Sequence, residues 1–173
     1  NGTKAQSIML IKGLTKNSPI HKWLSAYAAI AKSANKLKAK DLSIMCGNVY
    51  PAGKDENWLI EMVAKTIESN VYIFSQTKNK TAKKPSLKNL VILTTGLSGS
   101  NLSKAKQAAK KGFAIGEGVN TAKHLGDLPA NHCTPRIIEK KVKAMKKDFP
   151  KLKIKSFNEN DLAKLKMGSF LSV

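Results

Sequence analysis

The longest helical pattern in the sequence runs from about Leu102 to about Leu125 and stops at Gly126, a residue type that commonly follows a helix. Its predicted inward-facing stripe is Ala108, Gly112, Ile115, Val119 and Ala122. A helix of this length exceeds the ~11 residues that are usual in globular proteins. We therefore expect it to connect two domains, with separate folding segments before and after it.

Strand-like and helix-like segments alternate along the rest of the chain. Short apolar runs predict strands at residues 7–11, 42–46, 71–75, 90–95, 152–157 and 170–173. Apolar residues spaced by three or four positions predict three further helices, with the faces Ile20, Trp23, Tyr27, Ile30, Ala34, Leu37, then Leu59, Met62, Val63, Ile67, then Ile138, Val142, Met145, Phe149. This alternation predicts an α/β fold, with a mixed or parallel sheet and helices on both of its faces. The final apolar run has nothing after it, so we expect a truncated domain there.

Several polar residues stand where helices are expected to begin. Ser18-Pro19 and Thr134-Pro135 combine a hydroxyl cap with proline, and Asn158 precedes a short helix predicted to run to Lys166. Asp55-Glu56 and Glu159 with Asp161 could be paired catalytic carboxylates. Because both pairs open helices, where negative charge is favourable, we interpret them as caps.

The net charge of +20 invites a nucleic-acid interpretation, because Lys+Arg total 31 against 11 Asp+Glu. Arg136 is the only arginine, the lysines are spread along the whole chain, and few aromatic residues lie near them. This pattern lacks the arginine side chains that make bidentate contacts and the aromatic side chains that stack on bases in proteins that bind nucleic acids specifically. Cys46 and Cys133 are too sparse for a disulfide framework, and no apolar run is long enough to span a membrane, so we expect a cytoplasmic protein without membrane contact.

Three local motifs have competing interpretations. His124, His132 and Cys133 could suggest zinc, but no second ligand pair stands at a suitable spacing, so a helix end and a loop are favoured. The turn 95–100 could hold a phosphate, but it lacks the pattern of a phosphate-binding loop, so we interpret it as a turn with Ser100 or Asn101 capping the helix. Glycines 112, 116 and 118 could suggest a nucleotide-binding loop, but no strand precedes them. We instead expect these small residues to let another helix approach closely.

The stretch Glu117-Gly118-Val119-Asn120-Thr121-Ala122-Lys123-His124-Leu125-Gly126-Asp127-Leu128-Pro129-Ala130-Asn131 resembles the linker hallmark of the leucyl (cytosol) aminopeptidases, E-G-x-N-x-A-R-x-L-x-N-x-P-P-N. The resemblance continues to residues 162–173, which are similar to D-L-x-K-L-G-M-G-x-x-L-x-V, and it is specific from about Trp58 onward. Asp127, Ala130 and Lys123 replace the family's Asn, second Pro and Arg.

The resemblance implies a macro-like N-terminal α/β domain at residues 1–100, a linker helix at 101–126, and the start of a peptidase catalytic domain at 127–173. It also implies a homo-hexameric enzyme that removes N-terminal residues, preferentially leucine, from peptides with two divalent metal ions, Mn or Zn. The family's metal-binding segments, including N-T-D-A-E-G-R, have no counterpart in this sequence. We therefore expect no catalytic, cofactor-binding or metal residue in this segment, which alone would be inactive and would serve assembly or regulation.

A second hypothesis comes from the charge rather than from the resemblance. In it the chain is a non-catalytic, lysine-rich α/β module that binds nucleic acid or another polyanion, with weak contacts made through its lysines. The two hypotheses are compatible, because a domain without catalytic residues is free to acquire a second task.

Overall fold

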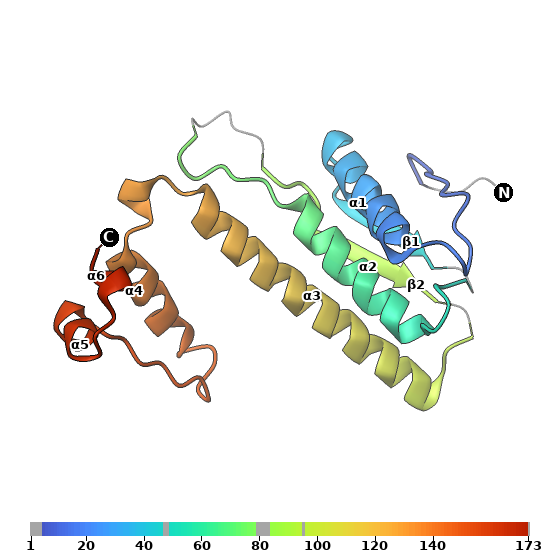
Figure 1. Cartoon of the computed structure of the whole chain (residues 1–173). Coiled ribbons are helices and arrows are strands. Elements are labelled where there is room, and N and C mark those ends of the chain that lie inside the picture. The colour runs from blue at the N-terminus through green and yellow to red at the C-terminus, as the bar shows by residue number, and fades with distance from the viewer. Residues whose placement is uncertain (1–4, 47–48, 79–83, 95, 173) are drawn as a thin grey trace. The chain divides into compact units, whose positions relative to one another are not determined.

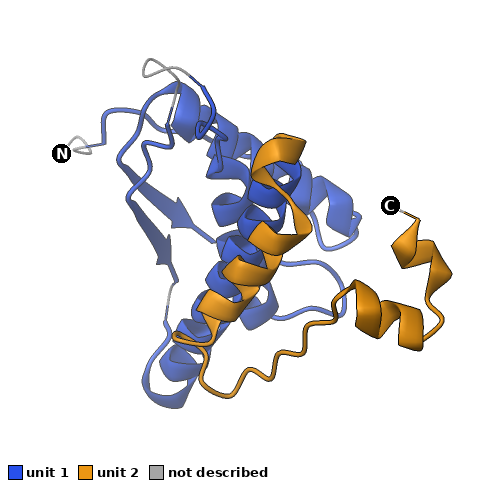
Figure 2. Cartoon of the chain, turned by 90° about the vertical axis from the view of Figure 1, so that its left-hand side faces the viewer, with its two compact units in different colours: residues 1–127 blue, residues 128–173 orange. Residues whose placement is uncertain are grey.

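The computed structural model describes residues 5–46, 49–78, 84–94 and 96–172, and the chain divides into two compact units, residues 1–127 and 128–173 (Figure 2). Unit 1 contains, in order, α1 (Ile20–Lys36), β1 (Asp41–Met45), α2 (Glu56–Val71), β2 (Asn89–Leu93) and α3 (Gly99–Asp127) (Figure 1). Unit 2 contains the 3-10 turn η1 (Ala130–His132), α4 (Pro135–Met145), α5 (Glu159–Lys164) and α6 (Gly168–Leu171). The combination of helices with a small parallel sheet confirms the α/β class. The division into a domain, a linker helix and a second domain at residues 100 and 126 stays a prediction.

The sheet has two parallel strands, β1 and β2, connected through α2. Asp41 lies opposite Asn89 and Met45 opposite Leu93. The residues that alternate with Met45 along the strands pack toward the helices, namely Leu42, Ile44, Leu90 and Ile92. On the other face Met45, Val91 and Leu93 are 71%, 47% and 43% exposed. The described helices thus cover one face only, and the prediction of helices on both faces was wrong.

The core of unit 1 lies between α1, α2 and the inner face of the sheet. The predicted apolar face of α2 is confirmed, because Leu59, Met62, Val63 and Ile67 are all buried. On α1 the middle of the predicted face is buried, whereas Ile20 and Leu37 at its two ends are exposed. Burial of large apolar side chains is the main favourable term in folding, so this three-layer contact holds unit 1 together.

Cys46 follows β1 and lies in this core beside Tyr27 of α1. Burial raises the pKa of Cys46 to about 11, although a hydrogen bond with Tyr27 partly opposes the effect. Burial also raises the pKa of the Tyr27 phenol. Both groups are therefore neutral near pH 7.

Four predicted strands are absent from the described residues. Residues 7–11, 72–75 and 152–157 have no regular structure, and Phe170 and Leu171 belong to α6. Val71 continues the buried face of α2 and is helical. An apolar run becomes a strand only when a neighbouring strand accepts its backbone hydrogen bonds, and these runs have none beside them. Thr95 and Val173, at the ends of two predicted strands, lie outside the described residues.

Helix caps agree with the sequence at the starts of α2, α4 and α5 and differ at the start of α1. Asp55, Thr134 and Asn158 each accept a hydrogen bond from a backbone N–H of the following helix, and Asn158 forms a reciprocal capping box with Asp161. In contrast, α1 has Pro19 at its N-cap position, and the Ser18 hydroxyl accepts from the Thr15 N–H at 2.9 Å instead. The Ser18 cap prediction was wrong.

Unit 2 has short helices with little burial. Helices α4, α5 and α6 contain no buried residue within the described part of the chain. The predicted face of α4 remains partly open, with Ile138, Met145 and the following Phe149 37%, 41% and 58% exposed. No helix in the described segments is long and apolar enough to cross a lipid bilayer.

Candidate functional site

Residues 117–127, which carry the first part of the family resemblance, lie on α3, which packs along α2. Gly112 and Gly116 are buried at this contact. A Cβ atom added to Gly112 would lie 2.1 Å from the Glu61 carbonyl oxygen, and one added to Gly116 would lie 2.6 Å from the Glu68 Cβ. The two glycines therefore allow the helix backbones to approach closely, as predicted for them.

The rest of the predicted α3 stripe needs correction. Ile115 and Ala122 are exposed, whereas Ala105, Gly112 and Gly116 are the buried positions. Gly118 faces open space, with nothing within 4 Å of an added Cβ, so the prediction of a close helix approach there was wrong. The smallest residues, rather than the largest apolar ones, face α2 because the two backbones are so close.

Two residues of the hallmark contact the end of α2. The Asn120 Nδ2 donates to the Glu68 carbonyl oxygen and to the Glu68 Oε1, both at 3.0 Å. The Lys123 ammonium donates to the Ser69 carbonyl oxygen. The last carbonyls of a helix lack intrahelical partners, and a cation near them is favoured by the helix dipole. Asn120 and Lys123 therefore satisfy and stabilise the C-terminal end of α2.

The segment that follows α2 is held by the same part of α3. The Tyr72 hydroxyl donates to Asp127 Oδ2 at 3.1 Å, and the Lys123 ammonium lies 5.9 Å from the centre of the Tyr72 ring. The rings of Phe74 and His124 are 5.7 Å apart. These contacts place the hallmark residues in a structural clamp, which we call the α2 clamp and define as Asn120, Lys123, His124 and Asp127.

Glu68 is a titratable residue that the clamp contacts through Asn120. Burial raises the pKa of its carboxyl group, the hydrogen bond from Asn120 lowers it, and the charge of Glu117 raises it again. Together these effects raise the pKa of Glu68 above its ordinary value. A carboxylate that is costly to ionise and lies at a helix contact lowers the stability of that contact when it is ionised, and the nearby charge of Glu117 adds to this cost.

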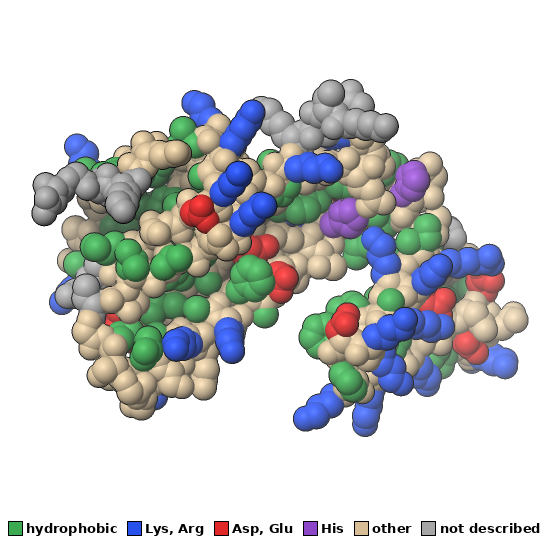
Figure 3. Space-filling model, turned by 180° about the vertical axis from the view of Figure 1, so that it is seen from behind, with side chains coloured by type: hydrophobic (Ala, Val, Ile, Leu, Met, Phe, Trp, Pro, Cys, Tyr) green, Lys and Arg blue, Asp and Glu red, His purple; other side chains and the backbone are tan. Residues whose placement is uncertain are grey.

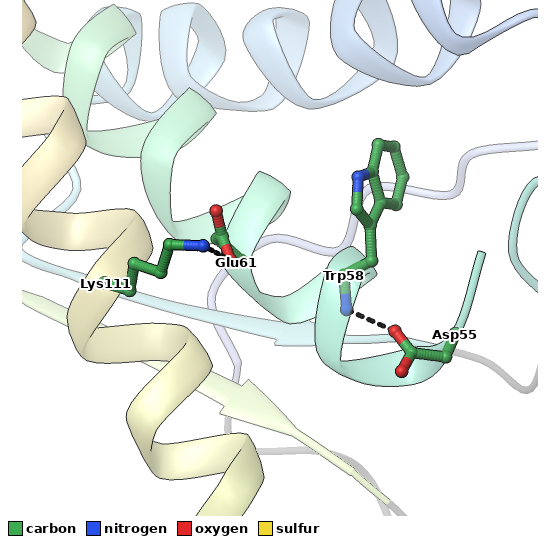
Figure 4. Close-up of polar contacts among 4 residues, drawn as sticks. All are labelled: Asp55, Trp58, Glu61 and Lys111. Atoms are coloured by element: carbon green, nitrogen blue, oxygen red, sulfur yellow. Dashed lines mark hydrogen bonds and ion pairs between the residues drawn. The ribbon is translucent and has the colours of Figure 1, made fainter.

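The predicted caps of α2 and the α2–α3 contact are visible in Figure 4. Asp55 Oδ1 accepts from the Trp58 N–H at 2.8 Å, which confirms Asp55 as a cap rather than as one of two catalytic carboxylates. Nearby, Lys111 forms an ion pair with Glu61 at 3.0 Å across the two helices. The lysine side chain is 67% exposed, so this pair contributes little to stability.

The residues considered for metal binding are dispersed. The His124 ring contacts that of Phe74 in unit 1 at a tilt of 51°, whereas His132 lies in η1 and Cys133 directly follows it. Within residues 5–46, 49–78, 84–94 and 96–172, no three His, Cys, Asp or Glu side chains are grouped so that they could hold a metal ion. These residues do not fit the two-metal centre that the family resemblance implies.

The turn considered for phosphate binding leads directly into α3. Thr95 lies outside the described residues, and Gly96 and Gly99 have φ of +75° and +52°. Helix α3 begins at Gly99, so Ser100 and Asn101 lie within its first turn and do not cap it as predicted. The Ser98 carbonyl oxygen instead accepts from the Asn101 and Leu102 N–H groups.

The lysines remain distributed over both units in the folded chain. Figure 3 shows their side chains over much of the visible face of unit 2 and more thinly over unit 1. The described ion pairs are Lys111–Glu61 and Lys143–Glu139, the second of which lowers the pKa of Glu139 through a hydrogen bond. Most of the positive charge is therefore solvated rather than paired.

Sequence reasoning missed the roles of Asn120 and Glu68. Asn120 occupies the Asn position of the family pattern, and an amide at such a position on a helix suggests a specific hydrogen bond. Its partner could not be inferred, because Glu68 lies 52 residues earlier in the chain. Lys123 stands where the family pattern has Arg, and the structure shows that it still binds the end of α2.

Comparison with known proteins agrees with the hallmark. The sequence model described as "Cytosol aminopeptidase family, catalytic domain" matches residues 120–173. A probable cytosol aminopeptidase of Aromatoleum aromaticum is 34% identical over 87% of this chain and 30% of its own length. One from Alkalilimnicola ehrlichii is 30% identical over 100% of this chain and 35% of its own length. The cytosol aminopeptidase of Pseudomonas aeruginosa is 26% identical over 98% and 34%.

These alignments run through both units, while the family's catalytic-domain model covers all of unit 2 and the last part of α3. The chain spans about a third of the length of the curated relatives that it matches. By its catalytic-domain match and its relatives, the chain belongs to the leucyl (cytosol) aminopeptidase family.

Proposed function

We propose that this chain is the N-terminal part of a metal-dependent leucyl aminopeptidase that hydrolyses N-terminal residues from peptides. The observation that carries the proposal is the match of residues 120–173 to the family's catalytic domain, together with relatives that align along 87% to 100% of the chain. We further propose that residues 1–100 correspond to a macro-like domain, 101–126 to the linker helix and 127–173 to the start of the catalytic domain.

In this proposal the segment serves assembly or regulation rather than chemistry. In the part of the chain that the structure describes, no three His, Cys, Asp or Glu side chains are grouped, which supports this role because a two-metal hydrolase needs several such ligands around one centre. The two divalent ions, Mn or Zn, would be bound by residues outside this chain. A homo-hexamer in the cytoplasm, acting on peptides, would follow from the family, and the relatives' name, cytosol aminopeptidase, supports that location.

Two experiments test the proposal. The reading frame that follows the codon of Val173 should encode the carboxylate-rich metal motifs of the family, and their absence there would refute the enzyme assignment. The purified 173-residue chain should show no hydrolysis of leucine p-nitroanilide with or without Mn²⁺, whereas the protein extended through those motifs should be active with the metal. Activity of the 173-residue chain alone would refute its non-catalytic role.

A second function is supported by the lysine content of unit 2. In α4 and the segment after it, up to Phe157, the acidic residues are Glu139 and Asp148. Lysines are concentrated there: Lys140, Lys141, Lys143, Lys146, Lys147, Lys151, Lys153 and Lys155. We propose that this segment binds nucleic acid or another polyanion weakly. Lysines that neutralise phosphates release counterions, so log K for duplex DNA should fall steeply with log salt. Binding that is absent at about 0.15 M salt would refute this function.

A further inference from the structure

Strand β2 has an open edge on the side away from β1. Within the described residues the sheet contains only the order β1–β2, so β2 is paired along one edge. The backbone N–H and C=O groups of its other edge have no strand beside them. Edges of this kind are templates for pairing with another extended chain.

A groove of about 510 Å³ lies along this edge. It is lined by Leu90 and Ile92 of β2 and by Thr94 just after it, and on the helix side by Ile60 and Ala64 of α2 and by residues of α3 that include Ala105, Ala109 and Phe113. Among the described lining residues none belongs to β1, so the groove lies on the open side of β2 rather than over the middle of the sheet. Its volume falls within the ~300–1,000 Å³ typical of binding sites, and its lining is mainly apolar.

The groove suits an extended chain because of how its walls are built. Leu90, Ile92 and Thr94 are every second residue, so their side chains lie on the same face of β2. A strand added beside β2 would point alternate side chains in that same direction, under α3. Ala105 and Ala109 are small, which leaves space between α3 and such a strand. A five-residue strand covers roughly 17 Å, which matches the length of β2.

Two cations mark the rim of the groove. Lys106 and Lys110 are one helical turn apart on α3 and both line the groove. The ion pairs in the described part of the chain use Lys111 and Lys143, so neither rim lysine is neutralised by one. Charge complementarity favours an acidic partner.

We propose that this groove binds an extended, acidic peptide segment of a partner protein by strand addition to β2. The main chain of the segment pairs with the open edge of β2, and its apolar side chains, at alternate positions, fill the space under α3. Its carboxylates lie toward Lys106 and Lys110. In this mode main-chain hydrogen bonds supply affinity, and the side-chain pockets and charges supply specificity.

Binding of three fluorescein-labelled peptides to the 173-residue chain, measured by fluorescence anisotropy at about 0.15 M salt, tests the proposal. The first peptide alternates valine and glutamate, the second has lysine in place of glutamate, and the third is the first with alternate backbone nitrogens methylated. The glutamate peptide should bind at least about ten-fold more tightly than either of the others, because only it combines the charge with a free strand edge.

Variants then locate the binding. The double change Lys106→Glu with Lys110→Glu should weaken binding of the glutamate peptide at least about ten-fold and strengthen binding of the lysine peptide. The control, Lys140→Glu with Lys147→Glu in unit 2, makes the same change in charge and should alter the binding of neither peptide appreciably. Ala109→Trp fills the groove and should also weaken binding at least about ten-fold at an unchanged unfolding midpoint. If Ala109→Trp does not fold, binding of the methylated peptide to the unchanged chain still tests whether the peptide pairs with β2.

Equal binding of the glutamate and lysine peptides would overturn the proposal, as would undiminished binding of the methylated peptide. A folded Ala109→Trp variant that binds normally would place the peptide elsewhere and overturn it too. Dodecanoate binding that Ala109→Trp abolishes, with no binding of any peptide, would identify the occupant as a free acyl anion rather than a strand.

Discussion

Replacing Gly112 by alanine tests the close approach of α2 and α3 directly. The added Cβ would lie 2.1 Å from the Glu61 carbonyl oxygen, 2.9 Å from the Glu61 carbonyl carbon and 3.0 Å from the Ala64 Cβ. The first two atoms belong to the backbone of α2, so no side chain can rotate away to make room. The helices must separate by about 1 Å, which loses contacts along their shared face.

The magnitude follows from two opposing effects. Overpacking typically costs about 1–3 kcal/mol, and a clash with backbone belongs at the upper end of that range. Alanine is favoured over glycine within a helix by about 1 kcal/mol, which opposes the clash. The expected net destabilisation is therefore about 2 kcal/mol. With a urea dependence of roughly 1–3 kcal/mol per molar, the unfolding midpoint should fall by about 1 M.

Gly118→Ala is the matched control on the same helix. Nothing lies within 4 Å of a Cβ at Gly118, so this change should raise stability by up to about 1 kcal/mol through helix propensity alone. Urea unfolding followed by tryptophan fluorescence reports on unit 1, because Trp23 and Trp58 are the only tryptophans and both lie there. Midpoints that shift in the same direction and by similar amounts for the two variants would refute the close-approach argument.

Three further changes probe the contacts around α2, each by urea unfolding. Glu68→Gln should be more stable than the unchanged chain near pH 7. Folding raises the pKa of Glu68, so its contribution to stability is fully present below its unfolded pKa of 4.5 and is lost as pH rises through its folded pKa. A stability difference between the two proteins that is constant from about pH 4 to pH 7 would contradict this sign. Asn120→Ala removes both hydrogen bonds to Glu68 and should cost about 1–2 kcal/mol, and an unchanged midpoint would show that the α2 clamp is not stabilising. Asp55→Ala removes the cap on the Trp58 N–H and should cost about 1 kcal/mol, whereas Asp55→Ser should retain most of the stability; equal losses would argue against capping.

The parts of the fold that sequence predicted well are those that depend on neighbouring residues. Thr134 and Asn158 cap their helices through contacts within three residues, and the spacing of Leu59, Met62 and Val63 identifies the buried face of α2. Helical hydrogen bonds are made within a few positions of each residue, so local pattern carries most of the necessary information.

The parts that failed depend on residues far away in the sequence. Residues 7–11 and 152–157 have the composition of strands, but strand formation needs a partner whose position a local pattern does not specify. The inward stripe of α3 was misplaced for the same reason. Hydrophobic periodicity favoured Ile115, whereas the close approach of α2 selects Gly112 and Gly116. The contacts of the α2 clamp join residues 50 or more positions apart, so a local pattern could not identify the partners of Asn120.

The rate at which the buried Cys46 thiol is modified should report on opening of the core of unit 1. A thiolate is the reactive form of cysteine, and with a pKa of about 11 only roughly one Cys46 thiol in ten thousand is ionised near pH 7, against a few per cent for a solvent-exposed cysteine. Cys133 is only partly buried. Alkylating reagents and oxidants should therefore modify Cys133 first, and the later appearance of a modified Cys46 should measure how often the core between α1 and the sheet opens.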